Sequence, residues 1–102
     1  MERNEKIVCA DGFSMSVQAS SFNYCAPRID NAHAYESVEI GFPSGYESLI
    51  ARYAENKEDY TGTVYGFVPA EVVTLVCIKH GGVIAGELPP GIPYLRAKDE
   101  DR

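Results

Sequence analysis

The sequence predicts an α+β fold, in which two helices cover one face of an antiparallel or mixed sheet of about four strands. Three observations predict this class. Short β-branched segments alternate apolar and polar residues with the period of a half-buried strand. An Asp-Gly pair separates two of these segments, and two other segments have helical spacing with signals for helix ends. The expected order along the chain is β-β-β-α-β-α, in a single domain that spans residues 1–102.

The N-terminal part of the chain is predicted to form a β-hairpin. Strands are expected at 5–10 and 13–19, because the first contains β-branched residues and the second alternates apolar with polar side chains. Asp11-Gly12 lies between them and is typical of a type I′ turn, which needs positive φ at both central residues. Residues 20–36 show no sustained period, so we expect a long loop, and such loops often serve a function.

The middle of the chain is predicted to continue with a strand at 37–42 and a helix at 45–55. The strand alternates apolar and polar residues and ends at Pro43. Ser44 followed by Glu47 matches a capping box. An apolar stripe with the spacing of one helical face follows, and we expect it to pack in the core; it contains Tyr46, Leu49, Ile50 and Tyr53.

The C-terminal part is predicted to contain a strand at 63–68 and an apolar helix at 70–80. Pro69 stands where the first turn of the helix would begin, and Gly81-Gly82 stands where the helix would end. Residues 83–95 are rich in proline and glycine, so we expect an extended tail or loop rather than a helix. Residues 96–102 are expected to be a frayed, charged tail.

The negative charge is concentrated in the middle of the chain. The net charge is −6, and residues 30–71 contain eight acidic residues against two basic ones, whereas the flanking segments are balanced. This composition disfavours direct binding to DNA or RNA, because affinity for phosphates comes from clustered Lys and Arg. A basic protein surface is the better partner. The alternative is that the acidic residues only keep the protein in solution.

The expected partner-binding residues are acidic residues of this middle segment and two tyrosines that flank predicted strands. Tyrosine is enriched in interfaces because it offers rigid contact area and a hydroxyl group. The set consists of Glu36, Glu39, Glu47, Glu55, Glu58, Asp59, Tyr35 and Tyr60.

The three cysteines are expected to be free thiols, with Cys9 and Cys77 in the core and Cys25 in a more accessible loop. Cys25, His33 and Asp30 have the residue types needed for acyl transfer, although no known catalytic motif surrounds them. The histidines are 47 residues apart and lack ligand partners at useful spacing, so we expect no metal and no cofactor.

No apolar segment is long enough to span a membrane, and the N-terminal residues lack the apolar core of a signal peptide. From these observations we expect a cytoplasmic monomer that does not bind membranes.

Several segments together resemble small proteins carried by bacterial phages and mobile elements. They are Lys6–Ala19, Tyr24–Arg28 and Thr63–Pro69 leading into Lys79–Gly82, and the similarity covers residues 6–86. In size and charge the chain is also similar to the anti-CRISPR proteins of such elements. This resemblance implies a type I inhibitor that acts as a DNA mimic at the basic surface where a Cascade-type complex reads its PAM or target DNA. It implies no catalytic residue.

We therefore expect a non-enzymatic inhibitor that binds a basic surface of a CRISPR effector protein in the host bacterial cell. Two alternatives remain open. One is a small enzyme that uses the Cys25, His33 and Asp30 loop, and the other is a structural or regulatory phage protein without a role in CRISPR interference.

Overall fold

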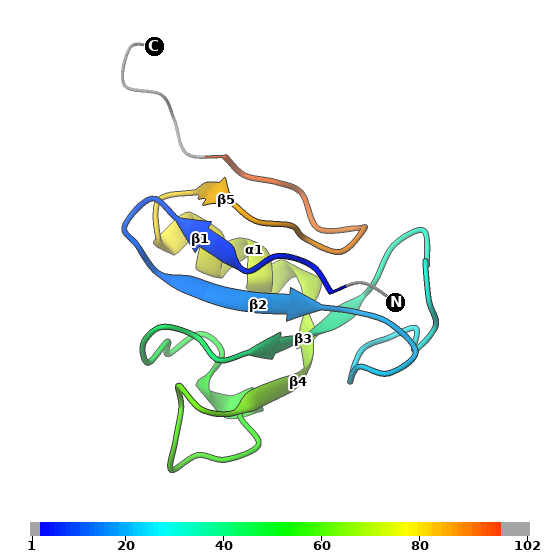
Figure 1. The fold of residues 1–102 in the computed structure, drawn as a ribbon, viewed down its shortest axis with the longest axis horizontal. Coiled ribbons are helices and arrows are strands. Elements are labelled where there is room, and N and C mark those ends of the chain that lie inside the picture. Colours follow the sequence, from blue (N-terminus) through cyan, green and yellow to red (C-terminus); the bar gives the residue numbers. More distant parts are fainter. Residues whose placement is uncertain (1–2, 97–102) are drawn as a thin grey trace.

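A five-stranded antiparallel sheet forms the framework of the computed structural model, which describes residues 3–96 (Figure 1). The strand order is β4-β3-β2-β1-β5, so the first strand lies inside the sheet and the last strand at one edge. The predicted α+β class is confirmed, but the described part of the chain has five strands and one α-helix. The strands are β1 (Ile7–Cys9), β2 (Ser14–Gln18), β3 (Ser37–Gly41), β4 (Val64–Pro69) and β5 (Val83–Ala85).

The β1–β2 hairpin lies where the sequence places it, with a different turn. Gly12 N donates to Cys9 O at 2.9 Å and Cys9 N donates to Phe13 O at 2.8 Å, which closes a three-residue loop. Gly12 alone has positive φ in this loop, at 95°. The predicted type I′ turn is therefore wrong, and the geometry is that of a three-residue hairpin with glycine in the left-handed region.

Replacing Gly12 by valine should destabilise the protein by about 1–2 kcal/mol, because an L-residue is strained at positive φ. No atom lies within 4 Å of the position that a Cβ would take, so backbone strain is the whole expected cost. The change would be measured as a lower midpoint of thermal unfolding. An unchanged midpoint would mean that this turn does not need a left-handed residue.

The prediction of a helix at 45–55 is wrong. A single 3-10 turn, η1 (Ala51–Tyr53), is present there. The capping box does not form, because Ser44 N donates to Ser14 O at 2.8 Å and Ser44 Oγ accepts from Ser14 N at 3.0 Å. Both groups of Ser44 are thus used to attach the segment to β2. The expected apolar stripe is also divided: Ile50 is buried, whereas Tyr46 is 61% exposed.

Helix α1 (Ala70–Lys79) confirms the helix expected at 70–80. Its end is fixed by the two glycines that follow: Gly81 N donates to Ile78 O at 3.1 Å and Gly82 N donates to Cys77 O at 2.8 Å. This pair of bonds is a Schellman motif, and both glycines have positive φ, at 91° and 95°. The helix therefore stops at a defined place and turns the chain toward β5.

Strand β5 lies in the segment that was expected to be an extended tail or loop. Val83 pairs with Cys9 and Ala85 pairs with Val8 of β1. A three-residue strand is too short to show a period, so only the contact with β1 identifies it. The proline-rich remainder follows the molecule closely, because Leu88 and Ile92 are buried in the core. Of the tail expected at 96–102, only Arg96 belongs to the described residues.

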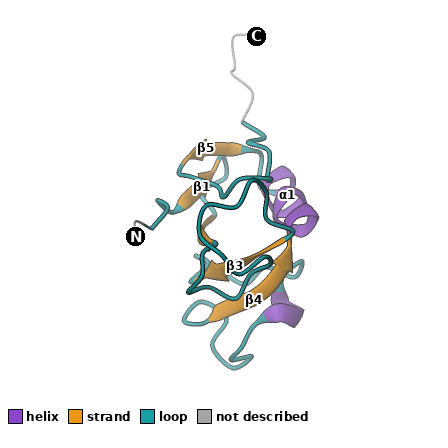
Figure 2. Cartoon of the chain, turned by 90° about the vertical axis from the view of Figure 1, so that its right-hand side faces the viewer, coloured by secondary structure: helices purple, strands orange, loops and turns teal. Residues whose placement is uncertain are grey.

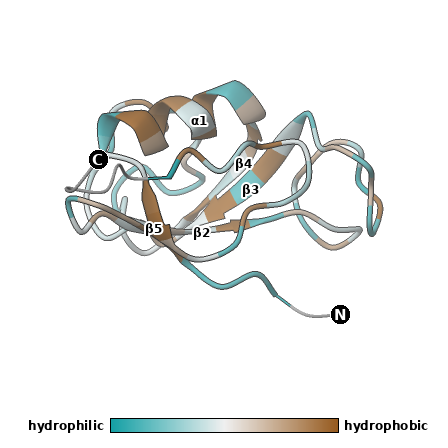
Figure 3. Ribbon diagram, turned by 90° about the horizontal axis from the view of Figure 1, so that it is seen from above, coloured by the Kyte–Doolittle hydropathy of each residue, from teal (hydrophilic) through white to brown (hydrophobic). Residues whose placement is uncertain are grey.

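The core lies between the sheet and α1, which crosses one face of the strands (Figures 2 and 3). Apolar residues of the strands and of the helix form one cluster, to which the helix contributes Val73, Val76 and Cys77. Polar residues of β2 are buried as well: the Gln18 amide donates to Asn4 O at 2.8 Å and to Ser16 Oγ at 2.9 Å. The chain around Asn4 thus covers part of the second face of the sheet.

Candidate functional site

Glu47 is buried, which contradicts the expectation that it belongs to a partner-binding surface. It is 2% exposed. Its Oε2 accepts hydrogen bonds from Lys79 Nζ at 2.9 Å and from Leu49 N at 2.8 Å. Its Oε1 lies 2.6 Å from His80 Nε2. Because the charge of Glu47 is compensated inside the protein, this residue cannot offer a carboxylate to a partner.

His80 links Glu47 to the hairpin turn. Its Nδ1 lies 2.6 Å from Asp11 Oδ2, and its ring stacks on Phe13 with centroids 4.1 Å apart. Each ring nitrogen faces a carboxylate, and both can donate only when the imidazole is protonated. Asp11, Glu47, Lys79 and His80, which we name the Glu47 cluster, therefore join the β1–β2 turn, the 44–50 segment and the end of α1.

The Glu47 cluster shifts the pKa values of its members. Burial disfavours the charged form of Glu47, but hydrogen bonds from Leu49 N, His80 and Lys79 outweigh it and lower the pKa of the carboxyl. For His80, burial is likewise outweighed by the bonds to Glu47 and Asp11, and its pKa is raised. The cluster thus stabilises the ionised forms of Asp11, Glu47 and His80.

The stability of the protein should be greatest between about pH 4.5 and 6.5 and should fall on either side. The raised pKa of His80 gives stability that is present below its unfolded value of 6.5 and is lost as pH rises through the folded value. The lowered pKa of Glu47 gives stability that is present above 4.5 and is lost as pH falls through the folded value. Urea unfolding midpoints across this range would measure the profile.

The variant His80→Gln should lose the alkaline fall in stability, and the exposed His33 supplies a matched control, His33→Gln. A His33→Gln profile like that of the unmodified protein, together with a flattened His80→Gln profile, would support the assignment. Equal profiles for all three proteins would contradict it.

The remaining predicted acidic residues do reach the surface. Four of them are exposed, and Glu39 is half-buried with its Oε1 accepting a hydrogen bond from Tyr24 N at 2.8 Å. Within residues 3–96, every ion pair involves Lys79 or His80, so none of these five carboxylates is paired there. We name this set the acidic band: Glu36, Glu39, Glu55, Glu58 and Asp59.

The acidic band extends along β4 and does not form one compact cluster. Ser37 pairs with Pro69 at the end of β4, so Glu36 lies near that end. Glu55 N donates to Val64 O at 3.0 Å, so the 55–59 turn lies at the start of the same strand. A six-residue strand is about 20 Å long. The carboxylates are therefore distributed over a length comparable with several steps of a nucleic-acid backbone.

The two tyrosines predicted for the site have different positions. Tyr35 is 3% exposed, and its hydroxyl donates to Ile29 O at 2.7 Å and accepts from Ala32 N at 3.2 Å. Its assignment to a partner surface is therefore wrong, and its role is to hold the 29–35 loop together. Tyr60 is half-buried and contacts the exposed ring of Tyr46 edge-on, with centroids 4.9 Å apart. The exposed aromatic group beside the 55–59 turn is thus Tyr46.

A second aromatic group lies beside Glu39 and was not found by sequence reasoning. Two residues of β4, Gly66 and Phe67, face the single residue Glu39 where the strand register shifts. Phe67 has φ of 53° and is 52% exposed, and its ring lies 5.9 Å from that of Tyr24. Such a bulge changes the direction of a side chain, here that of Phe67. The bulge is recognised from the pairing of β4 with β3 and not from the sequence of β4 alone.

The alternative catalytic set is not assembled for nucleophilic chemistry. Cys25 is 1% exposed, its Sγ donates to Ser20 O at 3.2 Å, and burial raises the pKa of its thiol. The expected accessibility of Cys25 is therefore wrong. His33 is exposed, whereas a reactive cysteine needs a base that promotes the thiolate. Cys9 and Cys77 are buried as expected, and burial raises the pKa of Cys77 to about 12.

The described residues contain neither a metal-binding cluster nor a membrane-spanning helix. Within residues 3–96, no group of three or more His, Cys, Asp or Glu side chains could hold a metal ion. Over the same range, the structure contains no helix with the length and apolar character of a membrane span.

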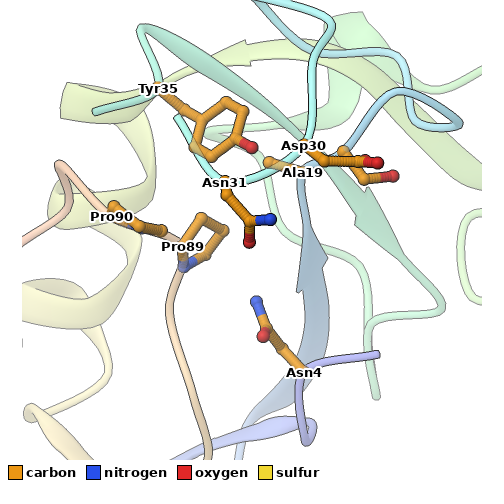
Figure 4. A pocket seen from close by; sticks show the side chains of 8 residues that line it. Asn4, Ala19, Asp30, Asn31, Tyr35, Pro89 and Pro90 are labelled. Carbon is orange, nitrogen blue, oxygen red and sulfur yellow. The ribbon is translucent and has the colours of Figure 1, made fainter. Parts of the chain in front are cut away.

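A polar pocket lies between three segments that are distant in sequence (Figure 4). Its volume is about 510 Å³. Asn4 belongs to the N-terminal segment, Asp30 and Asn31 to the long loop, and Pro89 and Pro90 to the segment after β5. Tyr35 lines the pocket and directly precedes Glu36, so the pocket lies near one end of the acidic band.

In the comparisons with known proteins, no protein-family model, no curated protein and no solved structure matches the chain.

Proposed function

We propose that this protein is a non-enzymatic inhibitor whose acidic band occupies a basic, nucleic-acid-binding surface of another protein. The partner we propose is the DNA-recognition site of a Cascade-type CRISPR effector complex in a bacterial cell, in accordance with the resemblance to anti-CRISPR proteins. The observation that carries the proposal is the absence of ion pairs at the five carboxylates of the acidic band within residues 3–96. Carboxylates without internal partners are available to cations of a second protein.

The contrast with Glu47 supports this proposal. Lys79 and His80 compensate Glu47 within the protein, whereas Arg52 and Lys57, the basic residues of the middle segment, form no ion pair with the band in the described chain. Lys57 Nζ instead donates to the carbonyl oxygens of Arg52 and Ala54, both at 3.0 Å. The basic residues of the middle segment therefore form no ion pair with these carboxylates within residues 3–96.

Paired charge reversals should reduce inhibition by about tenfold or more. An exposed ion pair contributes roughly 0.5–1 kcal/mol, and reversal replaces attraction by repulsion at both positions. The two variants are Glu36→Lys with Glu39→Lys and Glu58→Lys with Asp59→Lys. CRISPR interference in cells that express each variant would be measured, and circular dichroism would verify folding.

Glu5→Lys with Glu87→Lys is the matched control, because it changes net charge equally at residues that belong to neither end of the acidic band. We expect this control to keep its inhibition. If both band variants inhibit as well as the control, the acidic residues only aid solubility and the proposed function is wrong.

A further inference from the structure

The pocket beside Glu36 contains hydrogen-bond acceptors that the protein itself does not use. Asn4 Nδ2 donates to Val17 O at 3.1 Å, which leaves Asn4 Oδ1 without a donor among residues 3–96. Asp30 Oδ1 accepts from Ser21 N at 2.9 Å, which leaves Asp30 Oδ2 without one in the same range. The Asn31 amide forms no hydrogen bond within the described chain. Three acceptors, one of them charged, are therefore available.

Asn31 is held in a conformation that directs its amide into this space. Its φ is 57°, a left-handed value that asparagine tolerates better than most residues. Figure 4 shows the Asn31 amide pointing across the hollow toward Asn4, with the ring of Pro89 beside it.

The walls of the pocket are fixed by the protein before any ligand binds. The Tyr35 hydroxyl bonds to Ile29 O and Ala32 N on the two sides of Asn31. Tyr35 N donates to Pro90 O at 2.9 Å and attaches the proline segment to the loop. Rigid walls reduce the entropy that binding must overcome.

This chemistry favours a planar cation. A guanidinium group donates five hydrogen bonds in one plane, which suits a carboxylate and amide oxygens, and its weakly hydrated face can lie against proline rings. A volume of about 510 Å³ lies in the usual range of ligand pockets. Arg3 belongs to an adjoining smaller hollow and forms no ion pair with Asp30 within residues 3–96.

We infer that this pocket binds a guanidinium group, supplied by an arginine side chain of the basic partner protein. The source of the arginine rests on the proposed function, whereas the recognition of guanidinium rests on the pocket alone. Asn4 Oδ1 and Asn31 Oδ1 accept hydrogen bonds from the group, and Pro89 supports its face. Asp30, whose carboxylate Figure 4 shows turned away from Asn4, supplies negative charge at the rim of the pocket.

The test is a titration of the isotope-labelled full-length protein with N-acetyl-arginine amide, followed by changes in amide chemical shifts. We expect saturable changes at Ser20, Asn31 and Tyr35, and weaker ones with N-acetyl-citrulline amide, which has the same shape without the charge. Asp30→Asn should weaken arginine binding by about tenfold, since it removes the carboxylate that lines the pocket. Glu71→Gln is the matched control and should bind as before, because Glu71 is exposed and belongs to neither the pocket nor the acidic band.

Three results would overturn the inference: no saturable change, equal binding of the citrulline probe, or equal losses in Asp30→Asn and Glu71→Gln. The outcome is separable from that of the proposed function. Charge reversals that leave CRISPR interference blocked would refute the proposed function while arginine binding at the pocket persisted. Loss of inhibition on those reversals, with no arginine binding, would refute only the pocket.

Discussion

Replacement of Glu47 by alanine should lower the free energy of unfolding by about 3 kcal/mol, the lower end of the cost of removing one partner of a buried ion pair, because the Lys79 side chain is 46% exposed. The change removes the acceptor of Lys79 Nζ, His80 Nε2 and Leu49 N at once. In a domain of this size, 1 kcal/mol corresponds to about 4–8 °C in the midpoint of thermal unfolding. A fall of well over about 10 °C is therefore expected.

Glu58→Ala provides the comparison, because Glu58 is exposed and belongs to no ion pair among residues 3–96. Its effect should stay within about 0.5 kcal/mol. If Glu47→Ala is too unstable to fold, Glu47→Gln keeps the volume and removes only the charge. Equal midpoints for Glu47→Gln and Glu58→Ala would show that the buried carboxylate does not hold the three segments together.

Replacement of Gly86 by alanine should destabilise the protein by about 2–5 kcal/mol. Left-handed backbone strain contributes about 1–2 kcal/mol, and overpacking contributes about 1–3 kcal/mol. Gly86 has φ of 104°, and an added Cβ would lie 2.6 Å from Ile7 Cα and closer still to the Lys6 carbonyl oxygen. The new methyl group would therefore push β5 away from β1.

Gly45→Ala is the control for this prediction. No atom lies within 4 Å of the Cβ position at Gly45, and its φ lies outside the left-handed region. Hydrogen exchange would locate the effect: Gly86→Ala should lose protection first at Ala10 and Glu87, whose amides donate to Gly82 O and Glu5 O between the two segments. A Gly86→Ala variant as stable as Gly45→Ala would contradict the close packing of β5 on β1.

Local patterns in the sequence predicted much of the fold. The hairpin, the strands near 37–42 and 63–68, and the helix at 70–80 all follow from periodicity and from glycine or proline at their ends. The helix prediction for 45–55 was wrong, although the local pattern is consistent with a helix, because Ser44 bonds to Ser14 and Glu47 bonds to His80. Contacts between distant residues outweighed local preference there.

In the candidate site too, local features were predicted from the sequence and contacts between distant residues were not. Four acidic residues predicted to be exposed are exposed, because charged residues in turns are rarely buried. The burial of Glu47 depends on Lys79 and His80, more than 30 residues away, and no spacing in the sequence indicates this contact. The guanidinium pocket could not be predicted either, since its walls come from the N-terminal segment, the long loop and the proline segment.

The pairing of the first strand with the last has a consequence for synthesis in the cell. β1 lies between β2 and β5, so one of its edges stays unpaired until β5 has left the ribosome. Roughly 70 residues separate the two strands, and at about 5–20 residues per second this delay is roughly 4–14 s. An unpaired edge of apolar residues can associate with other nascent chains. The yield of folded protein should therefore depend on how quickly β5 pairs with β1, and this rate is distinct from the stability of the folded molecule.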